Sequence, residues 1–215
     1  MDPTLTSRLE NSKTSRILNI TGLALTSLPL LPDNLIELNC ADNYLKTLPP
    51  LPQGLRVLQC FCNKLTALPP LPESLVQMDC SYNHLTSIPE LPATIEEFSC
   101  SYNKLTELPE LPHSLKYIYF NHNNITTIKT LPPRLKDFDC SYNLVTSLPL
   151  LPATLKNLLC SSNKLSNLPY LPTSLNYVYC AENPFDIQFK SVRHYYSGIH
   201  YKVLIQSINT INKSF

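Results

Sequence analysis

Residues 75–94 read L-V-Q-M-D-C-S-Y-N-H-L-T-S-I-P-E-L-P-A-T, and the chain repeats this pattern along most of its length. Rows of twenty residues from Ser15 align without insertion or deletion on the pattern L-x-x-L-x-C-x-x-N-x-L-x-x-L-P-x-L-P-x-x. Eight full rows begin at residues 15, 35, 55, 75, 95, 115, 135 and 155, and a ninth begins at Leu175. Self-similarity at a fixed period indicates a solenoid in which each row is one turn.

The first half of each row predicts a short strand. Positions four and six of a row lie two residues apart, so their side chains point to the same, inward face. Position six is usually cysteine, and position four is apolar: Leu38, Leu58, Met78, Phe98, Ile118, Phe138, Leu158 and Val178. We therefore expect a parallel sheet of about nine short strands on the concave side.

Position nine is asparagine in every row after the first, from Asn43 to Asn183. A buried amide at this position can bond the backbone of the neighbouring row where the chain leaves the strand. We interpret the asparagines as a structural ladder and not as a binding site.

The second half of each row, such as Leu48-Pro49-Pro50-Leu51-Pro52, cannot be a helix. Prolines three residues apart remove amide donors and fix φ near −65°, which favours extended or polyproline-II backbone on the convex side. The pattern as a whole predicts a β-rich solenoid.

The two ends predict caps, because an open solenoid exposes its terminal core. Residues 1–14 are polar and are expected to be an N-terminal cap segment, followed by the solenoid over 15–184. Over 185–215 the apolar residues Phe185, Phe189, Val192 and Tyr196 recur at spacings of three and four, which predicts a helical C-terminal cap. The alternative is that this tail docks a partner or a second copy of the chain.

Composition narrows the class of protein. Of the residues, 43% are hydrophobic and 15% are charged, which argues against disorder. A net charge of +1 supplies no strong field, so neither nucleic acid nor a membrane is expected as a partner. Neither a secretory signal nor a membrane span is evident, so we expect a cytoplasmic, reducing location.

The repeat resembles the leucine-rich-repeat family, and in particular its short proline-rich subclass, known from bacterial secreted effectors with L-P-x-L-P repeats. Cysteine followed by Ser-Tyr-Asn, as in Cys80 to Asn83, Cys100 to Asn103 and Cys140 to Asn143, is similar to repeat proteins of amoeba-infecting giant viruses. The resemblance covers 15–184 and implies a binding module. Only 31 residues follow Pro184, which departs from the larger effectors that carry a ubiquitin-ligase domain.

Seven cysteines form one column, at residues 40, 60, 80, 100, 140, 160 and 180. Thiols one row apart cannot converge on a tetrahedral metal, and their Cβ atoms lie too far apart for a disulfide. We expect buried free thiols and no metal or cofactor. Cys62 stands at position eight, outside the core, and is expected to be the reactive one.

No catalytic group of residues emerges. The five histidines are scattered over different faces, and the three glycines form no phosphate loop. Asp137 and Asp139 lie on one strand face, roughly 7 Å apart, a spacing that glycoside hydrolases also use. Without a deep cleft we interpret them as a solvated pair.

The row over 115–134 departs most from the pattern. Phe120 replaces the cysteine, His122 replaces the usual tyrosine, and Lys129 replaces the first proline. Two interpretations remain open: neutral change with local repacking, or a bend that shapes a binding surface.

Positions three and five of each strand face solvent, and aromatic residues gather there. Tyrosine offers a rigid ring with a polar tip and is enriched at interfaces. Strands also favour aromatic residues without any binding role, and edge tyrosines could simply pack over the asparagine ladder. The expected partner-binding residues are Tyr117, Tyr119, Asp137, Asp139, Asn157, Leu159, Tyr177 and Tyr179, with edge contacts from Tyr82, Tyr102 and Tyr142.

The function we expect is therefore a non-catalytic module that binds a protein on the concave face, as a viral or pathogen factor acting on host proteins. The alternative is a structural component that associates through its ends, including the C-terminal cap, or its convex side.

Overall fold

The structure is a computed structural model that describes residues 3–185 and 209–210. The chain divides into two compact units, Met1–Leu105 and Thr106–Phe215, and the division falls inside the row that begins at Ile95. The helices expected in the tail, within 186–208 and 211–215, lie outside the described residues. The C-terminal cap therefore stays a prediction.

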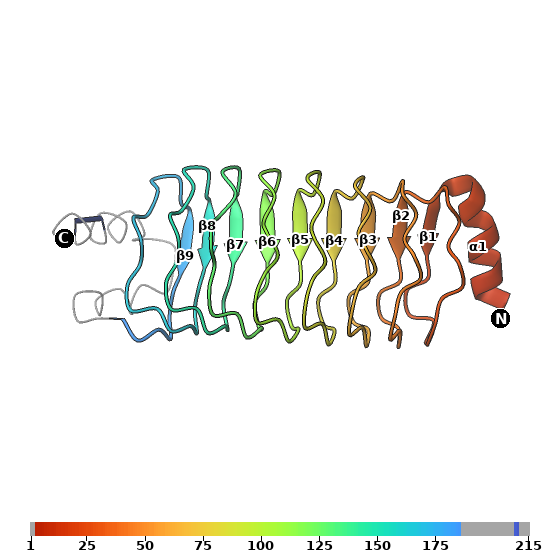
Figure 1. Cartoon of the computed structure of the whole chain (residues 1–215), viewed down its shortest axis with the longest axis horizontal. Coiled ribbons are helices and arrows are strands. Elements are labelled where there is room, and N and C mark those ends of the chain that lie inside the picture. The colour runs from red at the N-terminus through yellow and green to blue at the C-terminus, as the bar shows by residue number, and fades with distance from the viewer. Residues whose placement is uncertain (1–2, 186–208, 211–215) are drawn as a thin grey trace. The chain divides into compact units, whose positions relative to one another are not determined.

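Nine three-residue parallel strands lie within the described residues, and in each unit their order in the sheet is their order in the chain (Figure 1). Each strand occupies positions three to five of its row. Unit 1 holds β1 Ile17–Asn19, β2 Glu37–Asn39, β3 Val57–Gln59, β4 Gln77–Asp79 and β5 Glu97–Ser99. Unit 2 holds β6 Tyr117–Tyr119, β7 Asp137–Asp139, β8 Asn157–Leu159 and β9 Tyr177–Tyr179.

The predicted core is confirmed. Position four is buried in every strand, and within each unit these residues pair in register, as Met78 does with Phe98 in unit 1. All seven cysteines of the column are buried at position six. Each fully buried leucine contributes roughly 1.5–3 kcal/mol of hydrophobic stabilisation, so stacked rows build a continuous core.

The asparagine ladder is also confirmed. The Asn83 Nδ2 donates to the carbonyl oxygens of Cys60, Cys80 and Ser81 at 3.0, 3.1 and 3.1 Å. Its Oδ1 accepts a hydrogen bond from the Leu65 amide at 2.9 Å. One side chain thus serves the backbone of its own row and of the row before it, at the point where the strand ladder ends.

A second ladder, of hydroxyl groups at position twenty, was not predicted. The Ser74 Oγ donates to the Gln53 and Leu55 carbonyls at 2.8 and 2.6 Å, and Thr94 repeats the arrangement one row later. In unit 2 the Thr154 hydroxyl donates to the Pro133 and Leu135 carbonyls, and the Ser174 hydroxyl donates to the Leu155 carbonyl. Serine and threonine are so common on surfaces that their recurrence at this position gives a weak signal.

Position eight has a left-handed backbone in every row. The φ angle is +69° at Gly22 and between 52° and 54° at the eight residues that follow it in the column: Asp42, Cys62, Tyr82, Tyr102, His122, Tyr142, Ser162 and Glu182. Residues with a Cβ pay roughly 1–2 kcal/mol in this region. The conformation persists because the position-eight amide bonds the next row, as the Tyr82 amide does to the Ser101 carbonyl at 2.9 Å.

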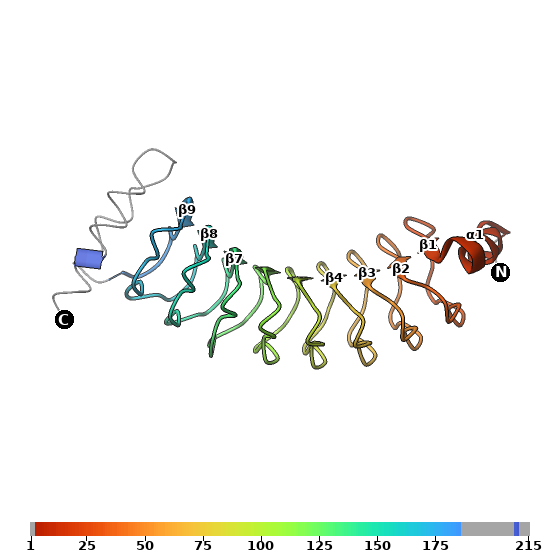
Figure 2. The ribbon, with the colours of Figure 1, turned by 90° about the horizontal axis from the view of Figure 1, so that it is seen from above.

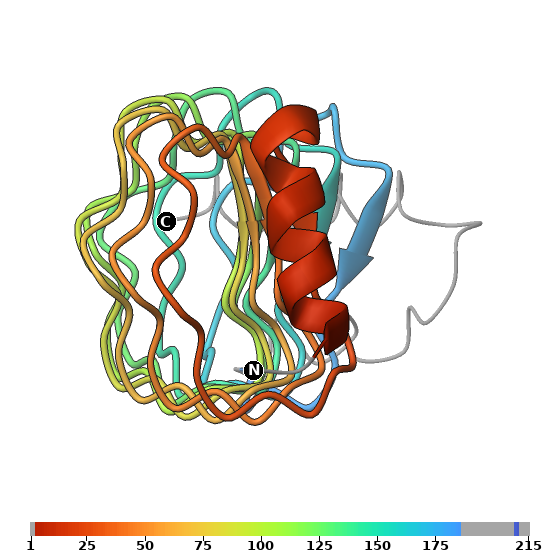
Figure 3. The same cartoon turned by 90° about the vertical axis from the view of Figure 1, so that its right-hand side faces the viewer.

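The N-terminal segment, expected to be a polar cap without assigned secondary structure, contains the helix α1, Pro3–Ser15. Figure 3 shows α1 lying across the end of unit 1 beside β1. Within α1 the side chains of Leu5 and Ser12 are buried, and the Arg8 Nη1 donates to the Asn19 carbonyl at 2.8 Å. The helix ends at Ser15, and the next residue, Arg16, has a φ of 62° and donates its amide to the Ser12 carbonyl.

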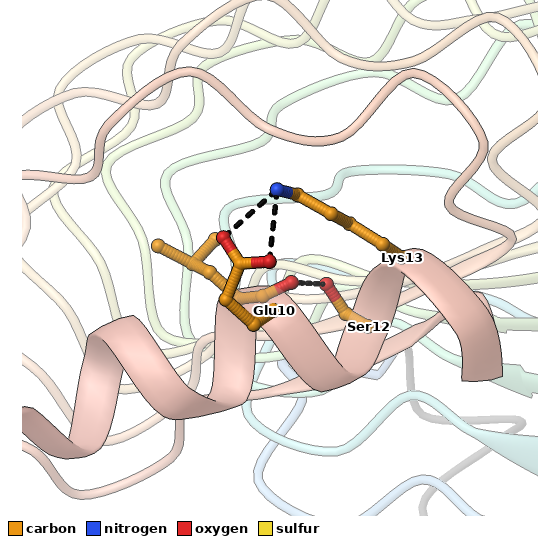
Figure 4. A network of polar contacts seen from close by, with 4 residues as sticks. Glu10, Ser12 and Lys13 are labelled. Atoms are coloured by element: carbon orange, nitrogen blue, oxygen red, sulfur yellow. Dashed lines mark hydrogen bonds and ion pairs between the residues drawn. The ribbon is translucent and has the colours of Figure 1, made fainter.

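Two polar contacts lie within α1 itself. Lys13 contacts both carboxylate oxygens of Glu10, at 2.8 and 3.0 Å, while the Ser12 Oγ donates to the Leu9 carbonyl at 2.7 Å (Figure 4). The ion pair is exposed and adds little stability. The apolar contact of Leu5 and the bond of Arg8 to Asn19 hold the helix in place instead.

The return segments run along the side opposite the strands in each unit (Figure 2). Leu48 and Leu51 are buried there, as the repeat predicts, while Leu30 and Leu150 at position sixteen are 82% and 84% exposed. A turn then leads into the next row, closed by bonds such as Leu55 N to Pro52 O at 3.0 Å.

Candidate functional site

The eight residues expected to bind a partner lie on four neighbouring strands of unit 2. Position three aligns Tyr117, Asp137, Asn157 and Tyr177 in register, and position five aligns Tyr119, Asp139, Leu159 and Tyr179. We call these eight residues the tyrosine face. Tyrosines stand on the two outer strands, β6 and β9, and the two carboxylates and one amide lie between them.

Exposure differs across the tyrosine face. Tyr177 and Tyr179 on β9 are 50% and 42% exposed, whereas the other six residues are half-buried. The face is therefore accessible without being a deep cleft, and its residues contact each other as well as solvent.

Asp137 lies at the centre of these contacts. Its carboxylate accepts hydrogen bonds from the Asn157 Nδ2 at 2.5 Å and from the Tyr119 hydroxyl at 3.5 Å. On the same side, the Lys136 Nζ lies over the Tyr117 ring, 6.0 Å from its centroid. The Asn157 Oδ1 is buried and has no hydrogen-bond partner among the residues that the structure describes.

Asp139 serves the local backbone. Its Oδ1 accepts a bond from the Ser141 amide at 2.9 Å, and its Oδ2 accepts one from the Asn121 Nδ2 at 2.8 Å. Asp79 and Asn39 make the same bond to the amide two residues later in unit 1. The turn bond of Asp139 therefore belongs to the repeat, and nothing in this geometry pairs Asp139 with Asp137 as glycosidase carboxylates.

The edge tyrosines stack at the left-handed position eight. Tyr82 and Tyr102 have ring centroids 4.2 Å apart at an interplanar angle of 10°, and His122 stacks on Tyr142 at 4.1 Å and 10°. Ring edges remain exposed, but at least one face of each ring is covered by its neighbour. This favours packing over partner binding as the role of these residues.

The cysteine thiols are all free. Burial raises the pKa of Cys40 and of Cys180 to about 12, and it raises the pKa of Cys60 and Cys80 well above the usual range. Cys62 is the half-buried one, as expected. Its pKa is raised too, first by partial burial and then by the Asp42 carboxylate beside it. The environment of Cys62 thus disfavours the reactive thiolate.

The irregular row has two structural consequences in unit 2. Phe120 is fully buried and packs at a tilt against Phe138, with centroids 5.7 Å apart. On the return side a groove of about 630 Å³ lies between 106–111 and 126–130, beside Lys129. Ile128 is buried at this groove, and Glu107, Glu110 and Lys129 are exposed.

Two classes of site find no support in the described ranges. Within residues 3–185 and 209–210, no three His, Cys, Asp or Glu side chains group as metal ligands would. Among the same described residues, no helix is long and apolar enough to cross a bilayer, and the longest, α1, has 13 residues.

No family model and no curated protein matches this chain. Among solved structures, YopM from Yersinia enterocolitica WA-314 is 31% identical, with a TM-score of 0.63 over 85% of this chain and 51% of that one. The leucine-rich-repeat domain of a Shigella effector is 28% identical, with a TM-score of 0.68 over 91% and 85%. A leucine-rich-repeat protein of Leptospira interrogans is 26% identical, with a TM-score of 0.69 over 85% and 59%.

This chain thus spans about half the length of the Yersinia protein. The three matches cover 85–91% of this chain. Together, these structural neighbours support the assignment of the chain to the leucine-rich-repeat proteins.

Proposed function

We propose that the protein is a non-catalytic interaction module that binds a protein partner on the tyrosine face of unit 2. The observation that carries this proposal is the in-register grouping of four tyrosines around Asp137 and Asn157 on four adjacent strands. Solvent-side tyrosines with a polar centre have the composition of a protein-binding patch.

The polar residues at the centre of the tyrosine face also support this proposal. A buried oxygen without a donor, such as the Asn157 Oδ1, costs about 1–3 kcal/mol. A bound partner that supplied a donor to this oxygen would remove that cost. The half-exposed Tyr177 and Tyr179 rings would bury apolar area around that contact.

The structural neighbours also support a proposal about the biological process in which the protein takes part. One is described as an effector of Shigella, and YopM comes from Yersinia. We propose by analogy that this protein is a pathogen or viral factor that acts on a host protein in a reducing, cytoplasmic compartment. Eight free thiols, seven of them buried, are consistent with such a compartment.

The double substitution Tyr117→Ala and Tyr179→Ala tests the proposal. Both side chains lie outside the core, so the fold should survive. Each tyrosine at an interface centre contributes on the order of 2 kcal/mol, so capture of the partner by immobilised protein should fall below detection. Circular dichroism verifies folding of each variant.

The matched control is Leu30→Ala with Leu150→Ala, two exposed leucines of the return side. This control should keep the partner. Retention by the tyrosine variant together with loss by the leucine variant would show that the wrong face was chosen.

A second candidate function is assembly through the return side. The exposed Leu150 is followed one row later by Tyr170, which is 50% exposed at the same position. Two neighbouring apolar side chains on this side could contact a second copy. Sedimentation of wild type and of the Leu150→Ala, Tyr170→Ala variant decides it, because only assembly through this side predicts a change in mass.

A further inference from the structure

Three lysines form a column along one edge of the tyrosine face. Lys116, Lys136 and Lys156 occupy position two of successive rows, directly before β6, β7 and β8. Their backbones are bonded in series: the Lys136 amide donates to the Lys116 carbonyl, and the Lys156 amide to the Lys136 carbonyl, each at 2.7 Å. We call these three residues the basic edge.

The basic edge concentrates charge of one sign. Neighbouring rows of a sheet stand about 4.8 Å apart, and like charges directly opposite each other are unfavourable. Position two of unit 1 shows no such column, since it holds Arg16, Ile36, Arg56, Val76 and Glu96. The column is therefore a feature of the rows that also carry the tyrosine face.

The exposed part of the basic edge is formed by Lys136 and Lys156, whereas Lys116 is half-buried. Asp137 is engaged by Asn157 and Tyr119, and Asp139 by Asn121 and the Ser141 amide. Within the described part of unit 2, neither Lys136 nor Lys156 has a carboxylate oxygen within 4.0 Å, and both are exposed. The Lys136 ammonium instead lies over the Tyr117 ring, which places its charge at the tyrosine face.

We propose that the basic edge binds acidic side chains of a protein segment whose neighbouring residues cover the tyrosine face. This inference rests on the proposed function and names the chemistry of its partner. Two or three carboxylates at one end of the bound segment would lie against the lysines. The part of the segment that covers the tyrosine face would carry no negative charge. Asp137 and Asp139 lie one and three residues from Lys136, so a long polyanion that crossed the tyrosine face, such as a nucleic acid, would be repelled there, whereas a short acidic peptide can lie along the lysines alone.

A hexaglutamate peptide is the probe. We expect it to shift the backbone amide resonances of residues 116–117, 136–137 and 156–157 of the full chain at about 0.05 M salt, and the shifts should vanish at about 0.5 M. The variant Lys136→Gln, Lys156→Gln should bind the peptide about ten-fold more weakly, or about three-fold per lysine. The control Lys164→Gln removes an exposed lysine of unit 2 outside the column and should bind as wild type does.

Two results would overturn the inference. The first is an absence of shifts at these residues, or equal binding by the double lysine variant when its melting temperature matches wild type. The second is tighter binding of an oligothymidylate than of hexaglutamate at the same residues, which would assign the edge to nucleic acid.

Failure of this inference is separable from failure of the proposed function. The Tyr117→Ala, Tyr179→Ala variant retains all three lysines and should still bind hexaglutamate. If that variant also keeps the protein partner, the proposed function fails; if only the lysine variant is without effect, the inference fails alone.

Discussion

Asn209 pairs with the backbone of Leu171, 38 residues earlier in the chain: its Oδ1 accepts from the Leu171 amide at 2.9 Å and its Nδ2 donates to the Leu171 carbonyl at 3.0 Å. Both residues are buried. The Asn209 side chain thus supplies a donor and an acceptor to the return segment of the row that begins at Leu155.

Replacement of Asn209 by alanine should destabilise unit 2. Two backbone groups of Leu171 lose their partners, and each buried orphan costs about 1–3 kcal/mol. Urea unfolding followed by circular dichroism measures the loss. The control Asn167→Ala removes an exposed amide of the same unit and should leave the midpoint unchanged. An Asn209 variant as stable as that control would contradict the role given to this pair.

Asn83→Ala should be more damaging than a surface substitution in unit 1. The Asn83 amide satisfies three carbonyls and one amide in two rows, and their exposure on loss of the side chain costs on the order of 3 kcal/mol. Differential scanning calorimetry checks this, with the exposed His84→Ala as its neighbour control. Equal melting temperatures for the two variants would show that the asparagine ladder does not contribute to stability.

Ser162→Gly should stabilise the protein, although glycine usually destabilises. The φ of Ser162 is 53°, and glycine adopts this region without the Cβ penalty. Glycine also gives the unfolded chain more conformational entropy, which offsets part of this gain. The expected net increase in the free energy of unfolding is about 0.5–1 kcal/mol. Ser162→Val should lose stability, because a β-branched residue tolerates positive φ least. Ser147→Gly, at an exposed position without positive φ, is the control and should lower the melting temperature.

Cys62 should be the first thiol to react in the folded protein, and it should react slowly at neutral pH. Partial burial and Asp42 raise its pKa, so the thiolate fraction at pH 7 is below that of a free cysteine and grows as the pH rises. Asp42→Asn removes the nearby negative charge, lowers the pKa of Cys62 and should speed the reaction with a thiol reagent. Cys62→Ser should abolish it. Rapid modification of several buried cysteines in the native protein would contradict this picture.

The sequence allowed the strands, the buried cysteines and the asparagine ladder to be predicted, because each recurs at a fixed position where its physical reason is local. Met78 and Asn83 needed only the period of the row to be placed. The helix α1 was missed because it occurs once and buries little more than Leu5, so its pattern resembles that of a polar segment. Its stability comes from contacts with β1 that no local pattern records.

The tyrosine face was predicted as a set of positions, and its internal contacts were not. The register that aligns Tyr117 with Asp137 follows from the repeat. Whether Asp139 bonds the Ser141 amide or faces its neighbour Asp137 depends on side-chain rotation, which a repeat pattern does not specify. The left-handed position eight was missed for a related reason, because tyrosine and histidine there give no warning of positive φ.

The asparagine ladder has a consequence for how such a chain can change over generations. Asn83 joins its own row only to the row before it, and the hydroxyl of Ser74 does the same. Gain or loss of one whole row by unequal crossing-over in the gene therefore leaves every remaining bond with an equivalent partner. Loss of a single codon, in contrast, shifts every later residue out of its position in the row. Lengthening by complete rows is the tolerated form of variation, and it widens the sheet by one strand without redesign of the core.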